Sequence, residues 1–80
     1  MPTVRFPFDA QLVSVRRDVC PGARWDRVQR VWTMSRAEAE IFLAASHARL
    51  EYCRSTARIM IDDELWVIGF VQGAPRRQAA

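Results

Sequence analysis

The sequence has no lysine, no asparagine and only two cysteines, Cys20 and Cys53, among its 80 residues. It also has no Gly-x-x-x-x-Gly-Lys-Ser/Thr phosphate loop and no apolar run of 18 residues. These absences argue against a nucleotide-driven motor and against a membrane-spanning helix. Because no secretory-type apolar segment is present near the first residue, we expect a soluble, cytoplasmic protein with reduced cysteines. A disulfide between the two cysteines is the alternative.

All 12 basic residues are arginine, the formal net charge is +3 and the isoelectric point is near 9.7. The charge is uneven, because residues 1–34 carry six arginines against three aspartates, whereas residues 35–70 carry four arginines against six acidic residues. A basic first half favours an acidic partner such as nucleic acid. The absence of lysine leaves a second explanation open, namely a coding bias towards arginine that is unrelated to function.

The spacing of apolar residues predicts one small α+β domain over residues 1–72, with the element order β-α-β-β-α-β-β and both helices on one face of a sheet. Residues 3–8 alternate as a strand that ends at Pro7 or lies at an edge. Asp9 is the expected N-cap of a first helix, with Phe8 and Val13 as its hydrophobic staple. Residues 73–80 have nothing to bury and are expected to be disordered.

A second helix is expected from about residue 36 to about residue 55, because Ser35 and Glu38 have the spacing of a capping box. An apolar stripe at helical spacing is expected to face the sheet, and it comprises Ala37, Ile41, Ala44, Ala45, Ala48 and Tyr52. A second hairpin follows around the acidic turn 62–64. Its strands are continuously apolar, which predicts burial on both faces or pairing with another chain. We therefore expect a homodimer whose interface includes Ile59, Ile61, Trp66, Ile68 and Phe70.

The first hairpin is the most informative segment, and it comprises residues 21–34. If residues 27–30 form the loop, Trp25 lies opposite Trp32, and the two indoles share one face. Such a pair in a small domain is most often part of the core, although it could also stack on unpaired bases. Basic side chains available to contact phosphates are Arg24, Arg27 and Arg30 on this hairpin, Arg16 and Arg17 on the first helix, and, less favoured, Arg5.

Residues 4–34 resemble the HARP domain of annealing helicases and small HARP-like modules. The resemblance rests on Phe6, on Trp25-Asp26, on Arg30 four residues after the aspartate, and on Trp32 two residues later. HARP domains bind branched DNA or junctions between single-stranded and double-stranded DNA, beside a motor. The resemblance therefore implies a DNA-binding module without the motor.

No arrangement of residues predicts catalysis, and we expect neither a cofactor nor a metal. His47 and Cys53 are six residues apart, which places them about 120° apart around a helix, so they cannot share a metal ion. The acidic turn 62–64 lacks the ligand spacing of a calcium loop. The sequence thus favours a non-catalytic module that binds single-stranded or junction DNA. A protein-interaction or self-assembly module using residues 59–70 and the second helix is the alternative.

Overall fold

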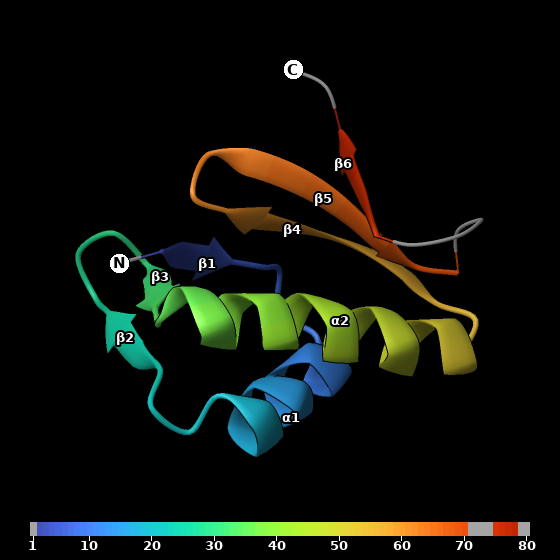
Figure 1. Ribbon diagram of the computed structural model, residues 1–80, viewed down its shortest axis with the longest axis horizontal. Coiled ribbons are helices and arrows are strands. Elements are labelled where there is room, and N and C mark those ends of the chain that lie inside the picture. The colour runs from blue at the N-terminus through green and yellow to red at the C-terminus, as the bar shows by residue number, and fades with distance from the viewer. Residues whose placement is uncertain (1, 71–74, 79–80) are drawn as a thin grey trace.

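Two helices lie against one face of an antiparallel sheet in the computed structural model, which describes residues 2–70 and 75–78 (Figure 1). In chain order the elements are β1 (Thr3–Arg5), α1 (Ala10–Val19), β2 (Arg24–Asp26), β3 (Val31–Thr33), α2 (Arg36–Tyr52), β4 (Thr56–Ile61), β5 (Glu64–Gly69) and β6 (Arg76–Gln78). The strand order in the sheet is β2-β3-β1-β4-β5-β6. The α+β class and the predicted order of the first seven elements are confirmed.

The start of the chain forms a short central strand followed by a capped helix. Strand β1 ends two residues before Pro7, as expected where a proline cannot donate a hydrogen bond to the sheet. The Asp9 carboxylate accepts hydrogen bonds from the backbone N–H groups of Gln11 and Leu12, which confirms the N-cap. The predicted hydrophobic staple is wrong, because Phe8 is 92% exposed and therefore cannot be packed on Val13.

Helix α2 begins with the predicted capping box between Ser35 and Glu38 and ends at residue 52, three residues earlier than expected. Its buried residues are Ala39, Phe42, Ser46 and Leu50. The predicted sheet-facing stripe was wrong, since five of its six members are exposed: Ala37, Ile41, Ala44, Ala48 and Tyr52. Both sets have helical spacing, and the set with Phe42 and Leu50 is buried because it removes more apolar surface from water.

Strands β4 and β5 form the second hairpin beneath α2, and the chain itself buries most of their predicted interface. Ile59, Ile61 and Ile68 belong to the hydrophobic core, and Trp66 packs partly buried against that core. Of the two expectations, burial on both faces or pairing with another chain, burial within the chain accounts for the three isoleucines. Of the five predicted interface residues, Phe70 is the most accessible, at 60% exposed.

Part of the tail that we expected to be disordered forms strand β6. Residues 76–78 pair antiparallel with β5, and the Arg77 guanidinium lies 2.6 Å from the Glu64 carboxylate. The outer edge of β5 is therefore covered within the chain. The expected domain boundary at residue 72 and the tail residues 73, 74, 79 and 80 lie outside the described residues.

Glycine is required at position 69, where β5 ends. Gly69 has φ of +103°, and a Cβ atom built there would lie 2.2 Å from the Ser55 carbonyl oxygen. The Gly69 N–H donates to Nδ1 of His47 at 3.0 Å, and the Phe70 N–H donates to the Ser55 carbonyl at 2.7 Å. These contacts hold the end of the second hairpin against the end of α2.

Candidate functional site

An open apolar groove lies between the first hairpin, α1 and the segment that joins β1 to α1. It has a volume of about 620 Å³ and is lined by Phe6, Phe8, Val13, Trp25 and Trp32. We call it the aromatic groove. The Phe8 side chain is almost wholly exposed and Trp25 is 49% exposed, so both rings are available to a ligand. Exposed rings at a concave surface favour the binding of flat, partly apolar groups.

The two tryptophans of the hairpin have different environments. Trp25 lies opposite Trp32 in the predicted register, and their ring centroids are 5.2 Å apart with planes inclined by 59°. Trp32 packs against the core, and Phe6 stacks on the buried Phe42 ring with centroids 5.3 Å apart. Trp32 and Phe6 are therefore anchored to the core, while Trp25 projects from it.

Arg16 is placed differently from the prediction, which made its side chain available to contact phosphates. Its guanidinium carbon lies 4.0 Å from the centroid of a Trp32 ring, and its Nε atom is buried without a hydrogen-bond partner. A guanidinium over an indole face is an attractive cation–π contact. Arg16 is half-buried and serves to fix Trp32, so it is not a freely available phosphate contact. Arg17, the next residue along α1, is exposed as predicted.

The turn of the first hairpin is held by Asp26. Its carboxylate accepts hydrogen bonds from the backbone N–H groups of Val28 and Gln29, and its carbonyl oxygen accepts from the N–H of Arg30. Arg30 has φ of +58°, a left-handed conformation that the turn requires. This order in the backbone gives Arg27 and Arg30 defined positions at the turn, and both side chains are exposed.

The remaining candidate arginines lie on the helix-free face of the sheet. Arg24 precedes Trp25 in β2, so the alternation of a strand directs it to the opposite face from the aromatic groove. Arg5 shares that opposite face and donates to the carbonyl oxygen of Gln29 at 3.3 Å. The structure thus places Trp25 in the groove and Arg27 and Arg30 at the turn. It stacks Arg16 on Trp32 and directs Arg24 to the opposite face of the sheet.

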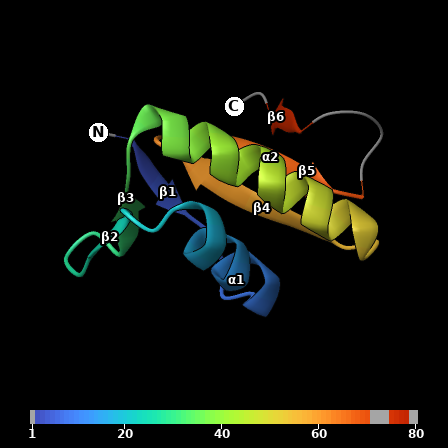
Figure 2. The ribbon, with the colours of Figure 1, turned by 60° about the horizontal axis from the view of Figure 1, so that its bottom comes forward.

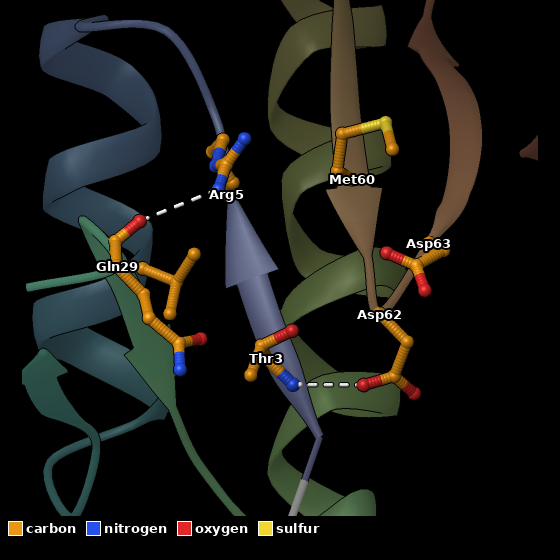
Figure 3. A pocket seen from close by; sticks show the side chains of 7 residues that line it. Thr3, Arg5, Gln29, Met60, Asp62 and Asp63 are labelled. Atoms are coloured by element: carbon orange, nitrogen blue, oxygen red, sulfur yellow. Dashed lines mark hydrogen bonds between the residues drawn. The ribbon is translucent and has the colours of Figure 1, made fainter.

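A smaller, polar hollow of about 120 Å³ lies on the helix-free face (Figure 3). The Thr3 N–H donates to the Asp62 carboxylate at 3.0 Å, and Arg5 donates to Gln29 across the hollow. Asp62 also lies 3.6 Å from Arg36. These polar groups already hydrogen-bond to one another. We therefore interpret the hollow as a structural contact that joins β1, β4 and the first hairpin.

The cysteines do not form a disulfide and show no nucleophilic arrangement. Cys20 is buried with its thiol donating to the Glu38 carbonyl oxygen, and Cys53 is exposed. Burial raises the pKa of the Cys20 thiol, the charge of Glu38 raises it further, and Arg16 acts in the opposite direction. Within the described residues, no cluster of three or more His, Cys, Asp or Glu side chains is placed to hold a metal ion, and neither helix is long and apolar enough to cross a bilayer.

Sequence reasoning missed two contributors to this site. Phe8 was assigned to a staple, although its position between Pro7 and the N-cap Asp9 holds it outside both the strand and the helix. Asp26 was noted only as part of a motif, and its role in the turn follows from its position two and three residues before the N–H groups of Val28 and Gln29, which donate to its carboxylate. An aspartate at the start of a four-residue loop is the signal that identifies this role.

Comparison of the chain with protein-family models, with curated proteins and with solved structures finds no match in any of the three. The resemblance of residues 4–34 to HARP domains therefore depends on the sequence alone, namely on Phe6, Trp25-Asp26, Arg30 and Trp32.

Proposed function

We propose that this protein is a non-catalytic module that binds single-stranded or junction DNA, with unpaired bases in the aromatic groove. The observation that carries the proposal is that the half-exposed Trp25 and the exposed Phe8 both line one open apolar groove. An exposed ring can stack on any base, because every base has a π-face. Bases within a duplex are already stacked on one another, so the groove favours unpaired segments.

The surrounding charge supports the same function. Arg17, Arg27 and Arg30 are exposed, and none of them forms an ion pair with another described residue within 4.0 Å. A phosphate chain that leaves the groove towards the turn would therefore meet guanidinium groups that have no competing acidic partner. The arginines then supply affinity without regard to base sequence, and the rings supply the preference for unpaired bases.

The proposed test is a titration of labelled single-stranded, forked and duplex DNA against the protein and a Phe8→Ala, Trp25→Ala double variant. Two stacking contacts contribute at least about 2 kcal/mol together, so we expect single-strand affinity to fall by about 30-fold or more. Phe70→Ala is the matched control, because Phe70 is also exposed but lies at the end of β5 outside the groove.

Circular dichroism of each variant checks that the fold is retained. Unchanged single-strand affinity in a folded double variant would contradict the assignment of the aromatic groove. Equal losses in the double variant and in Phe70→Ala would contradict it as well.

A further inference from the structure

The turn of the first hairpin exposes an apolar side chain at a place where turns usually carry polar ones. Val28 is 92% exposed, and its neighbours in the turn are Arg27, Gln29 and Arg30. Figure 2 shows this turn, which joins β2 to β3, at the margin of the molecule. Glycine, proline, asparagine, aspartate and serine dominate turns, so an exposed valine departs from the local preference. Departures of this kind are expected at functional sites.

Hydrogen bonds hold the backbone of the turn on both sides of the Val28 side chain. Val28 donates its N–H to the Asp26 carboxylate at 2.9 Å, and Gln29 donates its N–H to the same oxygen at 3.0 Å. The Gln29 carbonyl oxygen accepts from Arg5 at 3.3 Å. The β-branched side chain of valine is itself stiff. Val28 is therefore presented in a defined position and loses little conformational entropy when it contacts a partner.

We propose that Val28 packs on the last base pair of a duplex, at the junction where one strand separates and enters the aromatic groove. This inference rests on the proposed function and names the junction, rather than an isolated single strand, as the preferred ligand. The end of a duplex presents the flat, apolar face of a base pair bordered by phosphates. Val28 lies between Arg27 and Arg30 in the turn, so an apolar contact to the base pair is flanked by guanidinium groups that meet the phosphates.

The length of the hairpin agrees with a strand that continues from the duplex into the groove. Trp25 and Val28 are three residues apart, so their Cα atoms are separated by at most about 11 Å. Successive phosphates of one strand advance by about 3.4 Å along stacked DNA. About three unpaired nucleotides therefore connect a base pair on Val28 to a base stacked on Trp25.

A titration with labelled DNA hairpins tests this arrangement, each hairpin having the same stem and a single-stranded arm of a different length. We expect affinity to rise once the arm reaches about three nucleotides, because only then does a base reach Trp25. The stem with such an arm should also bind more tightly than the arm alone or the stem alone at the same salt concentration. Equal affinity for the arm alone and for the stem with its arm would overturn the proposal.

Substitutions at Val28 should change the preference for the junction in both directions. Val28→Ser removes the apolar contact and introduces a residue that turns favour, so it should lower the ratio of stem-and-arm affinity to arm affinity at least about fivefold. Val28→Phe should raise that ratio, because a ring covers more of the base pair. Ile41→Ser is the matched control, since Ile41 is exposed on α2 and does not line the aromatic groove. The same ratio in Val28→Ser and in the unsubstituted protein, with the fold retained, would contradict the role of Val28.

These outcomes separate the inference from the proposed function. If the Phe8→Ala, Trp25→Ala double variant loses single-strand affinity while Val28→Ser leaves the ratio unchanged, the groove binds unpaired bases and the inference about Val28 is wrong. If the unsubstituted protein binds none of these DNA molecules, both are wrong.

Methyl NMR gives a direct readout of the contact. The ring currents of a base pair should move the Val28 methyl signals upfield when the stem with its arm is added, and the arm alone should move them less. Val28 methyl signals that stay in place in the saturated complex would overturn the proposal.

Discussion

At the scale of single residues, Trp32 connects the core to the candidate site. Its ring packs against the core on one side, carries the Arg16 guanidinium at 4.0 Å, and faces Trp25 across the hairpin. The buried Nε atom of Arg16 has no other partner, so the indole face is the main compensation for its burial. Trp32 is therefore a structural residue, and Trp25 is the exposed member of the pair.

Trp32→Ala should therefore lower the free energy of unfolding by about 3 kcal/mol, the lower end for a large aromatic truncation, because the residue is only partly buried. Trp25→Ala should lower it by less than about 1.5 kcal/mol, since it loses mainly the aromatic pair. Urea unfolding followed by far-ultraviolet circular dichroism measures both values. Equal costs, or a larger cost for Trp25→Ala, would show that the roles of the two rings are exchanged.

At the scale of elements, the first hairpin presents charge through an ordered turn. Asp26 holds the turn through its side chain, and Arg30 adopts a left-handed conformation within it. A substitution at Arg30 that tests charge alone must tolerate positive φ, and asparagine does so better than alanine.

An Arg27→Ala, Arg30→Asn double variant should reduce the salt dependence of single-strand binding. Each lost phosphate contact lowers the slope of log affinity against log salt by about 0.7 for single strands, so the expected decrease is about 1.4. Arg58→Ala is the matched control, because Arg58 is exposed on β4, away from the first hairpin. An unchanged slope in the folded double variant, measured by titration at several salt concentrations, would remove these two residues from the site.

Local signals in the sequence predicted most elements, and competition between apolar faces explains the main errors. The Asp9 cap, the Ser35–Glu38 capping box and the register of the two tryptophans depend on neighbouring residues, so spacing alone predicted them. Helix α2 has apolar residues on both sides, and the sequence does not state which side the sheet covers. The interface expected at residues 59–70 had a separate origin, the continuously apolar strands, and Ile59, Ile61 and Ile68 of that set are buried within the chain.

The positions of the arginine side chains also could not be predicted from local sequence patterns. Arg16 and Arg17 are adjacent in α1, and only the docking of α1 beside β3 shows that the first is stacked on Trp32 and the second is exposed. Strand β6 was missed because a three-residue strand with two arginines and a glutamine has no apolar pattern of its own. Its pairing depends on the open edge of β5.

At the scale of the whole molecule, the aromatic groove is separate from the exposed apolar residues of α2. The groove is built by the β1–α1 segment, α1 and the first hairpin, and neither Ile41 nor Tyr52, which are exposed on α2, lines it.

The most direct measurement of the central claim uses the three tryptophans as reporters. In a titration with an unlabelled single-stranded oligonucleotide, nitrogen-15 NMR resolves the three indole N–H signals, with Trp66 as the internal control because it borders a different hollow beside α2. Binding in the aromatic groove predicts a large shift of the Trp25 signal, a smaller shift of Trp32 and none of Trp66. A shift confined to Trp66, or binding that leaves Trp25 unmoved, would contradict the claim that this groove holds DNA bases.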